Sequence, residues 1–178
     1  GVPISLDGWK IDGLELIEKL NQTAGSYGIG RIDHIEDRLV GIKSREIYEN
    51  PAAITLLTAH KALESLTLGR RQLRFKETVS AEYSDLLYDG LWFSSIRQDL
   101  SAFIDSTQRF VSGTVRLKLE KGNLRVVGRQ AQNSLYHHGL ATYDKGDQFN
   151  QDDAAGFIQL WGLSSRIQAQ AHQDKGEK

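Results

Sequence analysis

The chain has 178 residues, of which 39% are hydrophobic and 25% are charged, a composition typical of a soluble globular protein. Its 22 Lys and Arg residues nearly balance its 23 Asp and Glu residues, so the net charge is -1 and no overall positive field is available to attract nucleic acid or anionic lipid. No apolar stretch approaches the roughly 20 residues needed to cross a bilayer. We therefore expect neither a nucleic-acid-binding protein nor a membrane protein.

The sequence contains no cysteine and no methionine. The absence of cysteine excludes disulfides, thiolate metal ligands and a cysteine nucleophile, and it favours a reducing compartment, so we expect a cytoplasmic protein. The five histidines show no metal-ligand spacing, and no metal site is predicted. Because the chain opens with Gly1-Val2-Pro3-Ile4 rather than an initiator or a signal sequence, we expect it to be a fragment of a longer protein.

The first fifty positions predict a strand, a helix and then strands joined by loops. Residues 2–11 alternate loosely around a turn at Asp7-Gly8, and apolar residues at helical spacing follow in residues 14–24. Gly25 or Gly28 can end this helix. The run Gly28-Ile29-Gly30 also hints at a phosphate-binding loop, but the third glycine of that motif is missing, and a helix-terminating role explains the glycines better.

The centre of the sequence predicts three helices. Pro51 suits the first turn of a helix whose apolar positions recur until Gly69, and a second helical pattern continues until Gly90. Two helices separated by a glycine predict a long helical hairpin. Ser94 or Ser95 can cap a third helix, whose apolar stripe indicates a core face rather than a cofactor-binding surface.

Further along, alternating residues 115–119 and 124–126 flank Lys121-Gly122-Asn123, which predicts a β-hairpin, and residues 140–143 form a second short strand candidate. Residues 150–153 start a terminal helix with a broad apolar surface and a break at Gly162. That surface suits either a subunit interface or docking on the chain's own core. Because strands and helices run in blocks, we predict an α+β fold with antiparallel or mixed sheets, a long helical hairpin and a C-terminal oligomerisation helix.

The densest polar segment covers residues 31–51. If it is extended, neighbouring side chains point to opposite faces, and charges fall on both. A carboxylate such as Glu36 can hold an ammonium or paired N–H groups, and a hydroxyl such as that of Tyr48 can donate or accept a hydrogen bond. The residues alone favour a plainer alternative, an ion-pair network between loops. Lys43, Ser44 and Arg45 can contact an anion, although such residues are more often solvated or paired.

Two stretches of this segment, GIGRIDHIEDR at residues 28–38 and GIKSREIYENP at residues 41–51, closely resemble the GVGRID-x-VENR and GMKSRG-x-YETP motifs of argininosuccinate synthetases. The similarity continues in family order at further segments, namely residues 62–68, 87–94, 113–119, 134–136 and 153–158. Several long motifs in register are far more specific than any single one. The chain is similar to the carboxyl-terminal half of these enzymes.

The resemblance implies an ATP-dependent ligase of arginine biosynthesis that condenses citrulline and aspartate to argininosuccinate and releases AMP and pyrophosphate. The family's Ser-Gly-Gly-x-Asp-x-Ser type loop is absent here, so ATP, with Mg, would be bound mainly by an amino-terminal domain, and this chain alone is expected to be inactive and to hold no cofactor. Residues 1–150 would form a citrulline-binding synthetase domain, and residues 151–178 a multimerisation helix and tail of a homotetramer.

Carried over residue by residue, the resemblance places citrulline-binding positions at Glu36 and Tyr48 and a supporting position at Arg45. Neither Glu36 nor Tyr48 is expected to act as a general base, and no catalytic residue is assigned.

Three positions depart from the motifs, with Asp37 in place of asparagine, Glu46 in place of glycine and Asn50 in place of threonine. Because a glycine position can require a backbone conformation that glutamate resists, Glu46 is the departure that bears on local geometry. Glu46 and the missing phosphate loop also support an alternative from another class, a non-catalytic oligomerisation or small-molecule-binding module on the same scaffold.

Overall fold

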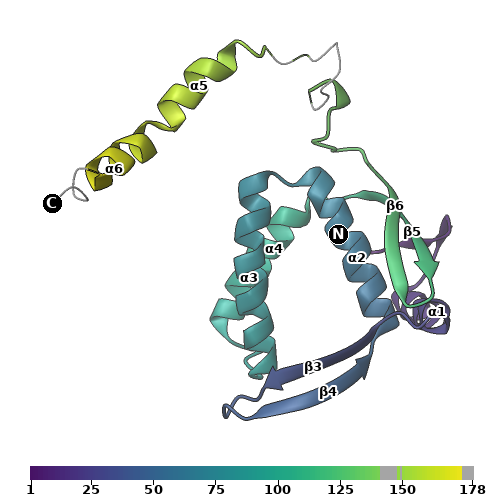
Figure 1. Cartoon of the computed structure of the whole chain (residues 1–178). Helices are drawn as coiled ribbons and strands as arrows, with labels where there is room; N and C mark the ends of the chain where they lie inside the picture. Colours follow the sequence, from purple (N-terminus) through teal and green to yellow (C-terminus); the bar gives the residue numbers. More distant parts are fainter. Residues whose placement is uncertain (141–147, 149, 174–178) are drawn as a thin grey trace. The chain divides into compact units, whose positions relative to one another are not determined.

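The computed structural model describes residues 1–140, 148 and 150–173 of the chain, which divides into two compact units, Gly1–Leu135 and Tyr136–Lys178. The described residues form helices and three two-stranded antiparallel sheets, so the predicted α+β fold is confirmed (Figure 1). No helix among these residues has the length and apolar character that crossing a membrane requires.

The first unit opens with a small β-hairpin. β1 (Ser5–Leu6) pairs with β2 (Trp9–Lys10) around the predicted turn, where Asp7 and Gly8 both have positive φ angles, of 51° and 86°. Glycine tolerates this left-handed conformation without steric cost, and aspartate is among the few other residues that adopt it. The predicted entry strand is therefore two short strands that fold back on each other.

Helix α1 (Gly13–Ser26) follows and begins after Asp12, whose carboxylate accepts a hydrogen bond from the Leu14 N–H. At its other end, Gly28 and Gly30 have φ angles of 73° and 88° and lead directly into a strand. The predicted helix-terminating role is confirmed for Gly28, and no helix follows these glycines that could make a phosphate-binding loop.

A longer hairpin comes next, formed by β3 (Arg31–Asp37) and β4 (Lys43–Glu49). Its base is held tightly against the following helix. The Asn50 N–H donates to the Gly30 carbonyl at 2.9 Å, and a Cβ atom on Gly30 would lie only 2.5 Å from the Pro51 nitrogen. Only glycine fits here, because its φ is positive and because the neighbouring backbone fills the space that a side chain would need.

Three helices make up the body of the first unit: α2 (Pro51–Thr67), α3 (Arg70–Tyr88) and α4 (Ser95–Gln108). The predicted starts are confirmed, since Pro51 is the first residue of α2 and the Ser94 hydroxyl caps α4. α2 and α3 are joined end to end and diverge from that junction, while α4 runs beside α3 (Figure 1).

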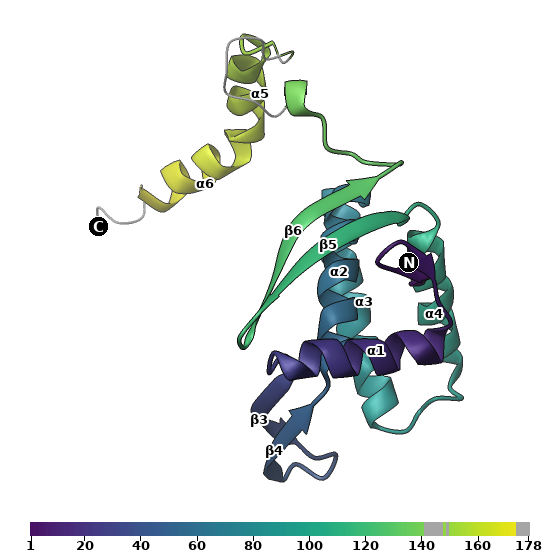
Figure 2. The ribbon, with the colours of Figure 1, turned by 90° about the vertical axis from the view of Figure 1, so that its right-hand side faces the viewer.

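The predicted hairpin of β5 (Gly113–Glu120) and β6 (Asn123–Ala131) is confirmed and packs against α2 (Figure 2). Two clusters of buried side chains hold the unit together. One joins α1 to the start of α2 and consists of Leu16, Leu20 and Ala52; the other lies at the end of α2 and consists of Leu63, Leu68 and Val111.

The second unit contains a short 3-10 turn (His138–Leu140), α5 (Asp153–Trp161) and α6 (Leu163–Gln173). The predicted helix start and the break at Gly162 are both confirmed. The strand candidate at residues 140–143 is not supported at Leu140, which ends the 3-10 turn, and its other positions lie outside the described residues.

Candidate functional site

The register of the β3–β4 hairpin places Glu36 and Tyr48 on one face. Ile32 pairs with Tyr48 and Glu36 pairs with Ser44, and alternate residues of a strand share a face. We call this side of the hairpin the acidic face; it carries Ile32, His34, Glu36, Ser44, Glu46 and Tyr48. The two residues that the resemblance assigns to citrulline binding are thus brought together by strand pairing.

Glu36 lies at the centre of the contacts on the acidic face. Its side chain is 13% exposed, and its Oε1 atom lies 3.1 Å from Arg38 Nη1. The Tyr48 hydroxyl donates to the same oxygen at 3.4 Å, a long and therefore weak hydrogen bond. Both contacts fall on Oε1, so the other carboxylate oxygen remains without a hydrogen bond to the described residues.

The environment of Tyr48 keeps its hydroxyl protonated. Burial raises the pKa of Tyr48 above its ordinary value, and the nearby negative charges of Glu36 and Glu46 raise it further, against a smaller opposing effect of Arg38. The His34 ring meets the Tyr48 ring edge-on, with centroids 5.5 Å apart. Tyr48 is therefore a neutral phenol with a defined ring orientation, able to donate a hydrogen bond to a ligand.

Arg38 completes this group from the turn between the strands. Its Nε donates to the Ser44 hydroxyl at 2.9 Å, and its Nη2 donates to the Glu46 carboxylate. Burial opposes the charge of Arg38, but Glu36, the Tyr88 hydroxyl and Glu46 together raise its pKa above the ordinary value. Sequence reasoning did not select Arg38, Glu46 or Tyr88 as site residues, although the alternation of β4 would have placed Glu46 beside Tyr48.

The opposite side of the hairpin, which we call the ion-pair face, carries balanced charges. Arg31 pairs with Glu49 at 2.8 Å, Lys43 pairs with Asp37 at 2.5 Å, and Arg45 makes two hydrogen bonds to Asp33 at 2.8 and 2.6 Å. This face is the ion-pair network that the residues alone favoured, built across strands rather than between loops.

Arg45 belongs to the ion-pair face. Its bond to the Asp33 carboxylate raises the pKa of Arg45 and lowers that of Asp33. The structure therefore places the predicted supporting residue on the other side of the strand from Glu36 and Tyr48. Any support it gives them passes through the backbone of β4.

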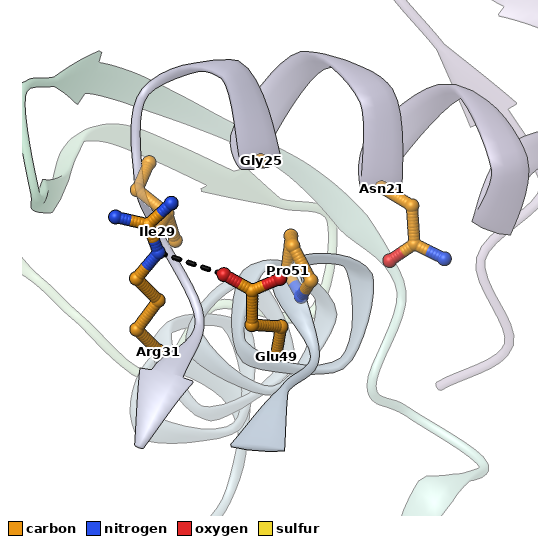
Figure 3. Close-up of a pocket in the computed structure, with 6 residues that line it drawn as sticks. All are labelled: Asn21, Gly25, Ile29, Arg31, Glu49 and Pro51. Carbon is orange, nitrogen blue, oxygen red and sulfur yellow. Dashed lines mark hydrogen bonds and ion pairs between the residues drawn. The ribbon is translucent and has the colours of Figure 1, made fainter. Parts of the chain in front are cut away.

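An open pocket of about 370 Å³ lies at the base of the hairpin (Figure 3). It is lined by Asn21, Gly25, Ile29, Arg31, Glu49 and Pro51. Its two charged side chains are bonded to each other, so they offer a ligand little unpaired charge. None of the predicted citrulline-binding positions lines this pocket, and no group of three or more His, Cys, Asp or Glu residues in the described part of the chain could hold a metal ion.

Two of the departures from the family motifs, Glu46 and Asp37, fit the local structure, whereas the buried side-chain oxygen of Asn50 has no hydrogen-bond partner among the described residues. Glu46 lies in regular β4, and in the described residues Asp7 alone combines a side chain with a positive φ, so the expected backbone conflict at Glu46 is absent. Asp37 pairs with Lys43. Asn50 stands at the N-cap of α2 without a capping bond, and Asn21 of α1 caps that helix instead, because its side-chain oxygen accepts the Ala52 N–H at 3.0 Å.

Comparison with known proteins gives a consistent result. Residues 1–168 match the family model described as the arginosuccinate synthase C-terminal domain. The chain is 62% identical over 182 residues to an argininosuccinate synthase of Dehalococcoides mccartyi strain 195, with 100% of the chain and 45% of that protein covered. It is 55% identical over 177 residues to an argininosuccinate synthase of Streptococcus gordonii, with 98% of the chain and 44% of that protein covered. The chain thus spans less than half the length of these relatives.

Proposed function

We propose a role for this chain within a larger enzyme, since the chain belongs to the argininosuccinate synthase family as its C-terminal domain. In this proposal the full-length protein condenses citrulline and aspartate to argininosuccinate, splits ATP to AMP and pyrophosphate, and serves arginine biosynthesis in the cytoplasm. ATP, with Mg, is bound mainly by the part of the enzyme that precedes this chain. The acidic face supplies contacts to citrulline.

The observation that carries the proposal is the placement of Glu36 and Tyr48 side by side, with their polar atoms 3.4 Å apart. The acidic face holds two carboxylates, Glu36 and Glu46, beside one guanidinium, that of Arg38 in the adjoining turn, so this group has a surplus of negative charge. That surplus suits the ammonium group of an amino acid, and a partly buried carboxylate holds such a group more strongly than an exposed one. The neutral Tyr48 hydroxyl can then fix the ligand's orientation.

These two residues contribute by positioning rather than by proton transfer. A ureido carbon is a poor electrophile until its oxygen becomes a leaving group, which the family achieves by adenylating that oxygen before the aspartate amine displaces AMP. Holding citrulline in one orientation lets both steps begin from aligned reactants, which lowers the entropic part of the barrier. Glu36 and Tyr48 would supply that alignment from the amino-acid end of citrulline.

We also propose that α5 and α6 assemble subunits into a homotetramer. Neither helix contains a buried residue, and Phe157, Ile158, Leu160 and Trp161 are all more than half exposed. Helices of 9 and 11 residues are marginally stable without packing partners. Short apolar helices whose side chains are not buried within their own chain are typical of subunit interfaces, so we infer that a second subunit covers them.

The test of the citrulline site uses the full-length protein that carries this chain. Glu36→Gln removes the charge that would hold the ammonium group and should raise the citrulline KM about 10-fold or more, the usual effect of losing a charge-assisted hydrogen bond. Tyr48→Phe removes a neutral hydrogen bond and should raise the citrulline KM roughly 3-fold to 10-fold. Steady-state kinetics with citrulline varied measures both effects.

Glu49→Gln is the matched control, because Glu49 is a carboxylate of the same hairpin on the ion-pair face. It should leave the citrulline KM within about twofold, the range of an exposed ion pair. The citrulline assignment is wrong if Glu36→Gln and Tyr48→Phe both leave the citrulline KM and kcat at the values of the unmodified enzyme.

A further inference from the structure

We propose that Arg38 is a positioning residue that fixes the orientation of the Glu36 carboxylate for an amino-acid ligand, and that Ser44, Glu46 and Tyr88 hold Arg38 in place. This inference rests on the proposed function of the acidic face. It adds to the site a set of residues that strand alternation alone does not reveal. One of them, Tyr88, comes from helix α3.

Every nitrogen of the Arg38 guanidinium contacts a different side chain of the hairpin. Nε bonds to Ser44 at 2.9 Å, Nη1 lies 3.1 Å from Glu36, and Nη2 bonds to the Glu46 carboxylate. A guanidinium is a planar fork with fixed donor directions, so three such contacts define its orientation completely. Arg38 is therefore turned toward the protein, and its role is to set the geometry of its neighbours.

The neighbour whose geometry matters most is Glu36. Arg38 and Tyr48 both contact Oε1, which fixes the rotation of the carboxylate and leaves Oε2 as the oxygen without a protein partner among the described residues. Arg38 also separates two negative charges, because Glu36 and Glu46 lie diagonally across the strand pair and would repel each other without a cation between them. One guanidinium thus keeps both carboxylates close to each other.

Tyr88 connects this arrangement to the helical body. It is the last residue of α3, and its hydroxyl lies near enough to Arg38 to raise the pKa of that guanidinium. The turn end of the β3–β4 hairpin lies near this end of α3 (Figure 1). The hairpin is therefore held at its base by the hydrogen bond from the Asn50 N–H to the Gly30 carbonyl, and its turn end carries Arg38 toward Tyr88.

The experiment compares Arg38→Gln, Arg38→Lys and the control Arg31→Gln in the full-length protein, with citrulline, aspartate and ATP varied in turn. Arg38→Gln should raise the citrulline KM about 10-fold to 100-fold, as for the loss of a charged partner, with the aspartate and ATP KM values within about twofold and kcat at saturating citrulline nearly unchanged. Arg38→Lys keeps the charge but not the fork, so it should recover part of the loss. Arg31→Gln, on the ion-pair face, should change none of these values.

Glu46→Gln and Tyr88→Phe test the residues that hold Arg38, and they keep the proposal testable if Arg38→Gln does not fold. Each should raise the citrulline KM about threefold, the effect of one weakened hydrogen bond. Combining Tyr88→Phe with Arg38→Gln should add nothing further, because Tyr88 acts through Arg38. A fully additive double variant overturns the part assigned to Tyr88.

Two results overturn the role of Arg38. If Glu36→Gln raises the citrulline KM while Arg38→Gln, Glu46→Gln and Tyr88→Phe leave it unchanged, the citrulline site stands and the positioning role is wrong. If Arg38→Gln weakens all three substrates equally and lowers the melting temperature, the residue has a general structural role. If Glu36→Gln has no effect either, the proposed function of the acidic face fails as well.

Discussion

Gly30 is the residue on which the position of the β3–β4 hairpin depends. It has a positive φ, and a Cβ atom would lie 2.5 Å from the Pro51 nitrogen and 2.6 Å from its Cα. Gly30→Ala should therefore lower the free energy of unfolding by about 3 kcal/mol or more, since the left-handed conformation alone costs about 1–2 kcal/mol and the displaced backbone adds to it. Urea unfolding followed by circular dichroism measures the change.

Gly41→Ala separates the two causes. Gly41 also has a positive φ, of 80°, but no heavy atom lies within 4 Å of its added Cβ. This variant should lose only the conformational part, about 1–2 kcal/mol. Equal losses for the two variants would show that the close approach to Pro51 is accommodated without strain.

The site residues differ in how far the sequence could predict them. Glu36 and Tyr48 share a face because alternation within two paired strands requires it once the hairpin is recognised. Arg45 falls on the other face for the same reason, since it lies an odd number of residues from Tyr48. Tyr88 could not be predicted, because its approach to Arg38 depends on how α3 packs and not on any local pattern.

Among the helices, one buried carboxylate links α2, α3 and α4. Glu64 of α2 accepts from Gln108 of α4 at 2.8 Å, and its Oε1 also lies 3.0 Å from His60 and 3.1 Å from Lys76 of α3. Burial alone would raise the pKa of Glu64, but the hydrogen bonds from His60, Gln108 and Lys76 outweigh it and lower the pKa to about 2. The ionised form of Glu64 therefore stabilises the packing of the three helices.

Glu64→Gln should lower the free energy of unfolding at pH 7 by about 3 kcal/mol, the usual cost of breaking a buried ionic contact. Because the pKa of Glu64 is lower in the folded protein than in the unfolded chain, its ionised carboxylate stabilises the fold fully above the unfolded pKa near 4.5. This contribution disappears as the pH falls toward 2. The unmodified protein should therefore lose stability between about pH 5 and pH 2, whereas Glu64→Gln should lose less over that range. Denaturant unfolding at several pH values measures the difference.

Glu15→Gln is the control for this experiment. Glu15 pairs with Lys19 one helical turn away, and both side chains are 53% exposed. Its loss should cost less than about 0.5 kcal/mol at pH 7. A comparable loss in the two variants would contradict the idea that burial makes Glu64 important.

At the scale of elements, local chemistry predicted where helices and strands begin and end, and it predicted the β5–β6 hairpin, but it did not predict how the helices pack. Pro51, Ser94 and the turn at Lys121-Gly122-Asn123 mark boundaries through fixed backbone preferences or caps, and the structure confirms each of them. The helical pattern predicted a hairpin of α2 and α3, whereas the helix that packs along α3 is α4. The cap that Asn21 of α1 provides for α2 could not be predicted from the local sequence either, because the donor and acceptor are 31 residues apart.

For the whole molecule, the assembly that we propose depends on the terminal helices. If α5 and α6 join subunits, Ile158→Asp places a charge on the apolar surface of α5 and should shift the full-length protein from a tetramer to smaller species. Gln170→Asp, also on an exposed helical position, is the control and should leave the tetramer intact. Light scattering after size-exclusion chromatography measures the mass, and a monomeric unmodified protein would contradict the proposed assembly.

The positions of the three tryptophans allow different parts of the chain to be followed by fluorescence. Trp9 lies in β2, Trp92 in the connection between α3 and α4, and Trp161 at the end of α5, and their exposed fractions are 80%, 50% and 75%. Replacing any two by phenylalanine leaves one emitter in a known region. Contact with another subunit or domain removes water from the indole that it covers and shifts that emission to shorter wavelength, so the spectrum identifies which region has been covered.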